Sequence, residues 1–254
     1  MDRLIYTAMS SLKLLDSMKV KQANALANVN TIGFKDTFNF ATETASVQGP
    51  GFNSRFVPVS QTIDEVVLRE GPLRETGRKM DVYMKGSTVL GVEAPNDQVA
   101  FTRRGDLNID EAGFLKTGNG FLVLGEGGGP IATPVGLDLF ISDDGSVMAV
   151  DPALPETPPS LVGKLMLRDA SEMILARRPD TLYEPKDKLG QGGDFQTGPV
   201  PPSVSPGALE GSSVSVAEQL VNFMDMSRSF EIRVKMISEM KELDDSGTSM
   251  MRYA

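Results

Sequence analysis

The stretch that decides the fold is residues 216–241, VAEQLVNFMDMSRSFEIRVKMISEMK, together with residues 3–29, RLIYTAMSSLKLLDSMKVKQANALANV, near the other end of the chain. In both stretches apolar residues recur at alternating spacings of three and four, as in a helix with one apolar stripe. Isolated helices of this length are only marginally stable in water, so each stripe needs a partner. Both ends are therefore predicted to be amphipathic helices that pair with other helices.

The predicted helix-assembly surface consists of the apolar positions in these two stripes. On the N-terminal side they are Ile5, Ala8, Leu12, Leu15, Leu26 and Val29, with Lys19 and Gln22 as polar members of the same stripe. On the C-terminal side they are Val216, Leu220, Phe223, Phe230, Val234 and Ile237, with Ser227 and Lys241 between and after them. The second helix is expected to begin after an N-cap at Ser212 or Ser213 and to end at the polar run 244–247.

The middle of the chain has a different pattern, in which short apolar runs alternate with turn residues. Between residues 80 and 167 these runs are 99–101, 107–109, 114–115, 121–124, 139–141, 147–150 and 161–167. Short, evenly spaced strands of this kind are typical of a small antiparallel barrel or sandwich. The residues 62–69 before them also alternate as a strand.

The predicted fold class is therefore α+β, with terminal helices that pair as a coiled coil and a central antiparallel domain that is β-rich and barrel-like or sandwich-like. Residues 1–35 and 212–254 are expected to form the helical domain, and residues 80–189 the β-rich domain. Residues 36–79 are expected to be an extended connector with a strand. Residues 190–211, which are rich in Gly and Pro, are expected to be a linker.

Composition excludes several classes of function. The chain has 254 residues, with 25 Lys and Arg against 34 Asp and Glu, and a formal charge of −9. An acidic chain without a basic run is a poor candidate for binding nucleic acid or an anionic membrane. It has no His and no Cys, which removes disulfides, thiolate and imidazole metal sites and the common nucleophile systems. The start has no apolar segment typical of a cleaved secretion signal, and no run is long enough to span a membrane.

The candidate chemical motifs have simpler readings. The Gly-rich run 125–129 lacks the Lys-Ser/Thr and the helix that follow a phosphate-binding loop. Asp143 and Asp144 precede Gly145 between two apolar runs, which predicts a hairpin turn and not a Ca²⁺ loop. The basic groups Arg103–Arg104, Arg177–Arg178 and Lys186 with Lys188 are expected on a solvated face or in ion pairs between subunits. No catalytic, cofactor or metal site is predicted.

Two terminal motifs resemble a known family. Residues 23–35, ANALANVNTIGFK, resemble the "NNLANxxTxGFK" signature of bacterial flagellar rod and hook proteins, and residues 207–214, GALEGSSV, resemble their "GxLExSNV" signature. The matching residues are Asn24, Leu26, Ala27, Asn28, Thr31, Gly33 and Phe34, and Gly207, Leu209, Glu210, Ser212 and Val214. Ala25 and Ser213 stand where the family usually has Asn. The start, MDRLIYTAM, is most similar to the F-type proximal-rod branch, and 101–105, FTRRG, is similar to the family's "YTRxG".

The resemblance implies a non-enzymatic subunit of the proximal rod of the flagellar basal body, which transmits torque. It implies that the terminal helices pair as a coiled-coil inner domain of an axial tube, with the β-rich domain outside. It also implies export by the flagellar type III apparatus without a cleaved signal, and assembly in the periplasmic space with further copies and other rod subunits. No nucleic acid, membrane insertion or cofactor is implied.

Two alternatives stay open from the sequence. A distal rod protein or a hook-like axial protein has the same signatures. A soluble β-domain protein that binds or hydrolyses glycans is a different class, and the absence of His and Cys speaks against an enzyme without excluding a glycosidase built on Asp and Glu.

Overall fold

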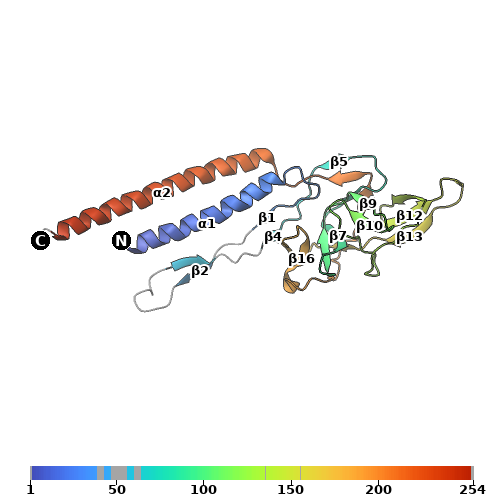
Figure 1. Cartoon of the computed structure of the whole chain (residues 1–254), viewed down its shortest axis with the longest axis horizontal. Coiled ribbons are helices and arrows are strands. Elements are labelled where there is room, and N and C mark those ends of the chain that lie inside the picture. The colour runs from blue at the N-terminus through green and yellow to red at the C-terminus, as the bar shows by residue number, and fades with distance from the viewer. Residues whose placement is uncertain are drawn as a thin grey trace. The chain divides into compact units, whose positions relative to one another are not determined.

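The computed structural model describes residues 2–38, 43–46, 56–59, 64–134, 136–154 and 156–252 (Figure 1). In these residues the helices are α1 (Asp2–Ala27), α2 (Val216–Arg252) and a short 3-10 helix, η1 (Lys186–Lys188). The earlier strands are β1 (Thr37–Phe38), β2 (Glu43–Ser46), β3 (Phe56–Val59), β4 (Glu65–Val66), β5 (Leu73–Glu75), β6 (Val82–Met84), β7 (Thr88–Glu93) and β8 (Val99–Thr102). The later strands are β9 (Leu107–Ile109), β10 (Leu115–Thr117), β11 (Asp138–Ile141), β12 (Ser146–Val150), β13 (Ser160–Lys164), β14 (Leu167–Asp169), β15 (Leu175–Arg177), β16 (Tyr183–Pro185), β17 (Val204–Pro206) and β18 (Ala208–Glu210).

The chain divides into two compact units, each built from segments distant in sequence. The helical unit takes its described residues from Met1–Ala27, Asn39–Thr62 and Ser215–Ala254. The β unit takes its described residues from Asn28–Phe38 and Ile63–Val214. The N-terminal family motif is therefore divided, because Asn24, Leu26 and Ala27 belong to the helical unit and the rest belongs to the β unit.

In the helical unit, α1 and α2 run antiparallel and contact one another (Figure 1). The side-chain amide of Gln22 donates to the carbonyl of Gln219 at 3.1 Å, and the ammonium of Lys19 lies 3.8 Å from the centre of the Phe230 ring. The hairpin β2–β3 belongs to the same unit. Within the described residues, neither helix combines the length and the apolar character needed to cross a membrane.

The predicted ends of the helices need correction. α1 stops at Ala27, so Val29 lies in the following turn and not on the helix. α2 begins at Val216 and continues through the run 244–247, where an end was expected. The reason is that Asp, Ser and Gly carry only a weak preference against helix, which a long helix can override. Past Gly247 the Thr248 hydroxyl donates to the Asp244 carbonyl at 2.9 Å.

The β unit consists of several antiparallel sheets. Among the described residues the largest sheet has seven strands in the order β1-β4-β15-β16-β8-β7-β14, and β11-β12-β13 form a smaller sheet. The remaining pairs of the unit are β9 with β10, β6 with β17, and β5 with β18. The antiparallel β-rich domain and the α+β class are confirmed, but the described strands do not close into a barrel. Coiled-coil geometry between α1 and α2 stays a prediction.

Two buried clusters hold the β unit together. The larger one includes Met84, Leu90, Leu107, Leu115 and Ile141, all at most 2% exposed. The smaller one is centred on Phe101, whose ring packs edge-to-face on Phe195 at 4.7 Å between ring centres. Because burial of apolar surface is the main stabilising contribution in such a domain, these clusters provide the rigid frame for the polar groups described below.

The stretch 190–211, expected to be a linker, contains two of these strands. β17 pairs with β6, with Val204 opposite Met84, and β18 pairs with β5, with Leu209 opposite Arg74. Composition alone could not show this, since Gly and Pro are equally common in linkers and at the ends of short strands.

Candidate functional site

The two family motifs meet inside the β unit. The amide of Gly33 donates to the Glu210 carbonyl at 2.8 Å, and the amide of Ser213 donates to the Phe34 carbonyl at 3.0 Å. The Asp36 amide in turn donates to the Ser213 hydroxyl at 3.1 Å, across 177 residues of sequence. Segments far apart in the chain are thus joined like neighbouring strands, and the motif residues serve this junction.

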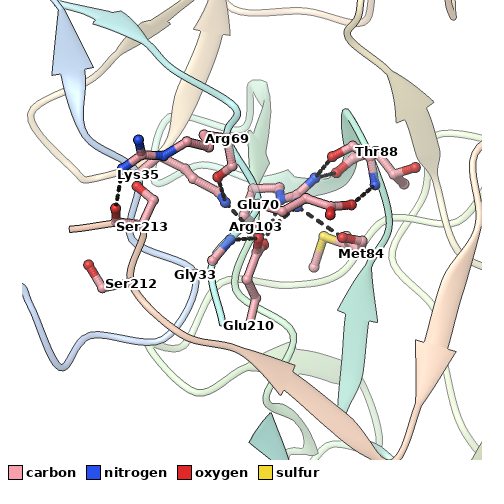
Figure 2. Close-up of polar contacts among 12 residues, drawn as sticks. Gly33, Lys35, Arg69, Glu70, Met84, Thr88, Arg103, Glu210, Ser212 and Ser213 are labelled. Atoms are coloured by element: carbon pink, nitrogen blue, oxygen red, sulfur yellow. Dashed lines mark hydrogen bonds and ion pairs between the residues drawn. The ribbon is translucent and has the colours of Figure 1, made fainter. Parts of the chain in front are cut away.

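The Glu210 carboxylate is the centre of the junction (Figure 2). Its Oε1 accepts from the Lys35 ammonium at 2.6 Å, from the Arg103 guanidinium at 2.8 Å and from the Gly71 amide at 2.8 Å. Its Oε2 accepts from Arg103 Nε at 2.7 Å. The side chains of Lys35, Arg103 and Glu210 are all fully buried. We call these three residues the buried charge cluster.

Every N–H of the Arg103 guanidinium has an acceptor. Besides the two bonds to Glu210, Arg103 donates to the carbonyls of Gly86 at 2.6 Å, Thr88 at 2.8 Å and Met84 at 2.9 Å. The residue therefore ties the strands β6 and β7 to the carboxylate of β18. Lys35 similarly donates to the Arg69 carbonyl at 2.6 Å. Buried charges are tolerated only with such complete bonding.

The environment shifts the pKa of both Lys35 and Glu210. The pKa of Lys35 is lowered from 10.5 to about 8, first by burial and second by the positive charge of Arg103, against the opposing effect of Glu210. Burial raises the pKa of Glu210, but the hydrogen bonds and charges of Arg103 and Lys35 outweigh it and hold the pKa below its ordinary value of 4.5. At neutral pH Glu210 is ionised, so it is the counter-ion of two buried cations.

A close backbone approach explains why the motif has glycine at position 33. Gly33 has φ +67°, and a Cβ built there would lie 2.3 Å from the Arg103 carbonyl oxygen. A side chain would therefore be strained by the backbone conformation and would also collide with the segment that carries Arg103. Gly33 lets the N-terminal motif lie directly against the FTRRG segment.

The expectation of solvated or intersubunit basic groups is wrong for Arg103, which is buried and paired within the chain. Arg177 also acts within the chain: its guanidinium lies 4.4 Å from the centre of the Phe34 ring and donates to the Lys35 carbonyl. Lys186 pairs with Glu65. The prediction failed because a charged residue at the end of a short strand gives no sign of whether it points inward.

The expected turns are confirmed where the chemical motifs were set aside. In the Gly-rich run the Gly125 amide donates to the Gly129 carbonyl at 2.8 Å, which closes a tight turn before Pro130. The Asp143–Asp144–Gly145 run joins β11 to β12, with Gly145 at φ +82°. In the part of the chain that the structure describes, no group of three or more Asp or Glu side chains could hold a metal ion.

On α1, the side chains of the predicted assembly surface lie at different depths. Leu15 is buried and Leu12 and Leu26 are half-buried. Ile5 and Ala8 belong to α1, but their side chains lie outside the described residues. Gln22, a polar member of the stripe, is buried and bonds to α2 as described above. The stripe of α1 thus lies at least partly against the second helix.

On α2, most of the predicted surface is exposed. Phe230 and Ile237 are half-buried, whereas Val216, Leu220, Phe223 and Val234 are 46%, 45%, 43% and 44% exposed. Further exposed apolar side chains on this helix are Val221, Met224, Ile232, Met236 and Leu243. Apolar residues occur on all sides of α2, so more than one set of positions along the helix follows the alternating spacing of three and four. One helix partner cannot cover them all.

The other motif residues stabilise the backbone near their own positions, and two residues of the buried charge cluster were not predicted from the sequence. Thr31 bonds to Asn28 through its hydroxyl at 3.1 Å, and the Ser212 hydroxyl accepts from the Val214 amide at 3.2 Å. Gly207 donates to the Asp81 carbonyl at 2.8 Å, and Leu209 is buried. Lys35 and Arg103 were not among the predicted site residues. A signal existed, since both lie inside stretches that resemble the family.

Comparison with known proteins agrees with this arrangement. Residues 205–250 match the family model for the flagellar basal body rod FlgEFG protein C-terminal region, and residues 83–149 match that for the flagellar hook protein FlgE/F/G D1 domain. The chain is 30% identical to the flagellar basal-body rod protein FlgF of Escherichia coli over 244 residues, 95% of each chain. It is 30% identical to FlgF of Salmonella typhimurium over 99% of each chain. It is also 30% identical to the basal-body rod protein FlgG of Buchnera aphidicola, over 88% of this chain and 91% of that protein. With both motifs joined around Glu210 and this similarity along its length, the chain belongs to the flagellar basal-body rod protein family.

Proposed function

We propose that this protein is a structural subunit of the flagellar basal-body rod, in the proximal position of the F-type proteins. The observation that carries this proposal is the exposed apolar surface of α2, on a chain similar to FlgF over 95% or more of its length. Apolar side chains such as Phe223 and Met224, 43% and 60% exposed, gain stability when a neighbouring subunit covers them. A rod requires this kind of non-closing contact between subunits.

In this proposal α1 and α2 pair as a coiled coil, and the free side of α2 binds helices of neighbouring copies and of other rod subunits. The protein has no enzymatic role: it transmits torque along an axial tube. It is exported by the flagellar type III apparatus without a cleaved signal and assembles in the periplasmic space. The buried charge cluster serves by keeping the β unit rigid under load.

The test is Phe223→Glu in a strain whose only copy carries the variant. We expect loss of motility and of the protein from isolated basal bodies, because a carboxylate in an apolar contact costs several kcal/mol. The control is Asn222→Glu, at the exposed neighbouring position of α2. Normal motility of the Phe223→Glu strain, with the variant present in basal bodies, would refute the proposed assembly surface.

The distal rod position is the second candidate, because the FlgG protein of Buchnera aphidicola reaches the same 30% identity. The start of the chain, MDRLIYTAM, which is most similar to the F-type proteins, favours the proximal position. Crosslinking this protein to its neighbours in intact basal bodies distinguishes the two positions.

A further inference from the structure

Residues 203–214 lie between parts of the β unit that come from both sides of the sequence; we call them the closing segment. On one side β17 and β18 pair with β6 and β5, and the Gly211 amide donates to the Pro72 carbonyl at 2.8 Å. On the other side the segment binds the N-terminal motif through Gly33 and Phe34. The closing segment is therefore an internal part of the β unit, with hydrogen-bonded partners on both of its sides.

The charges link the closing segment to the rest of the β unit. Within the described residues, the only carboxylate that bonds Lys35 or Arg103 is that of Glu210. Without the closing segment, Lys35 and Arg103, which are fully buried in the folded β unit, would lie near one another with no bonded carboxylate. The lowered pKa of Lys35, caused by burial and by Arg103, shows how unfavourable its charge is there even with Glu210 present. A buried ion pair that loses one partner is strongly destabilised.

We propose that the closing segment is a folding latch: the β unit cannot form its packed core until residues 203–214 have docked and Glu210 has neutralised Lys35 and Arg103. A chain in which residues 203–214 are not yet available keeps the other strands of the β unit unfolded. Folding of the β unit is thereby postponed until the closing segment is available, whatever the site of assembly of the protein. This property is independent of the position proposed for the protein in the rod.

Hydrogen exchange on the full-length protein, with increasing urea, tests the latch without any variant. Latch amides are those of Gly207, Gly211 and Ser213, and core amides are those of Gly91 and Leu124, all in backbone hydrogen bonds. We expect both groups to exchange through the same opening, with protection factors that agree within about 3-fold and respond equally to urea. If the latch amides exchange through a smaller opening while the core amides stay protected, the core stands without the latch and the proposal is wrong.

The variant Glu210→Gln, which keeps the shape and removes the charge, gives the second test. We expect exchange to become ~100-fold faster or more in the latch and the core alike. The matched control is Glu126→Gln, whose carboxylate pairs with Lys164 at 3.7 Å at the surface, and it should change neither group. Faster exchange of the latch alone would overturn the proposal.

A triple variant keeps the proposal testable should Glu210→Gln fail to fold. Lys35→Met with Arg103→Met and Glu210→Met removes all three charges but leaves the carbonyls of Met84, Gly86 and Thr88 without these donors, so its core is expected to be better protected than that of Glu210→Gln and less protected than that of the original chain. A core no better protected than that of Glu210→Gln would show that the unpaired charges are not the reason.

Discussion

Gly33→Ala is expected to destabilise the β unit far more than glycine replacement at a comparable turn. Gly33 has φ +67°, and a non-glycine residue in this left-handed region costs ~1–2 kcal/mol. The added Cβ would lie 2.3 Å from the Arg103 carbonyl oxygen and 2.7 Å from the Arg104 amide nitrogen, both inside the 3.0 Å that Cβ atoms keep from other atoms. Both neighbours are backbone, so they cannot rotate away.

Relief of this collision must move the N-terminal motif away from the FTRRG segment. That movement weakens the bond from the Gly33 amide to the Glu210 carbonyl, now 2.8 Å, which contributes ~1 kcal/mol. With the conformational cost and the strain of overpacking, ~1–3 kcal/mol, the total is ~3–6 kcal/mol.

Gly77→Ala is the matched control, because Gly77 has φ +71° but no atom within 4 Å of the position that a Cβ would occupy. Only the conformational cost of ~1–2 kcal/mol applies there. Urea unfolding of the two purified variants, followed by the near-ultraviolet circular dichroism of their tyrosines, measures both changes. Equal shifts of the urea midpoint in Gly33→Ala and Gly77→Ala would refute the reasoning, since the close approach to Arg103 would then have no energetic effect.

The remaining predictions concern the charges of the cluster. Because the folded-state pKa of Glu210 is below 4.5, its contribution to stability is present above pH 4.5 and is lost as the pH falls further. The urea midpoint of the original chain should therefore decrease below pH 4.5, and this decrease should be smaller in Glu210→Gln. An equal decrease in both would contradict the lowered pKa. Because the pKa of Lys35 is lowered from 10.5 to about 8, the unfolded chain binds more protons between these values, so the contribution of Lys35 to stability rises with pH there; in Lys35→Met this rise should disappear, and its persistence would assign it to another group. Arg103→Lys keeps the charge but loses the planar fork and two of five donors, so we expect a loss of ~3 kcal/mol or more in urea unfolding, whereas a loss under ~1 kcal/mol would mean that the charge alone suffices.

Local pattern was enough to predict several of the β strands in the middle of the chain, but not β1–β3, β5–β7 or β15–β18. β9 begins and ends at the predicted residues, 107 and 109, and β8, β11 and β12 differ by one residue at one end. In these strands apolar and polar residues alternate, or apolar residues follow one another, between strong turn residues. Residues close in sequence are therefore enough to predict them. The end of α2 was missed because helix-breaking preferences of ~1 kcal/mol per residue are small beside the cooperativity of a long helix.

The centre of the site could not be predicted by local reasoning. Arg103 and Glu210 are 107 residues apart, and nothing near either one shows that it is buried with the other. The spacing of residues along the chain predicts contacts only between residues a few positions apart. Arg103 and Glu210 meet because the strands β17 and β18 pair with β6 and β5. The family motifs did mark the correct segments, since Gly33 and Glu210 both belong to them.

The measurement that tests the central claim most directly is crosslinking from α2 in assembled flagella. A photo-crosslinking residue at Leu220, 45% exposed in the isolated chain, is introduced into the protein in motile cells, and the basal bodies are isolated and analysed by mass spectrometry. We expect crosslinks from position 220 to the helices of another copy or of another rod subunit. Basal bodies that lack the protein, or that contain it without any crosslink from position 220 to a second subunit, would contradict the account.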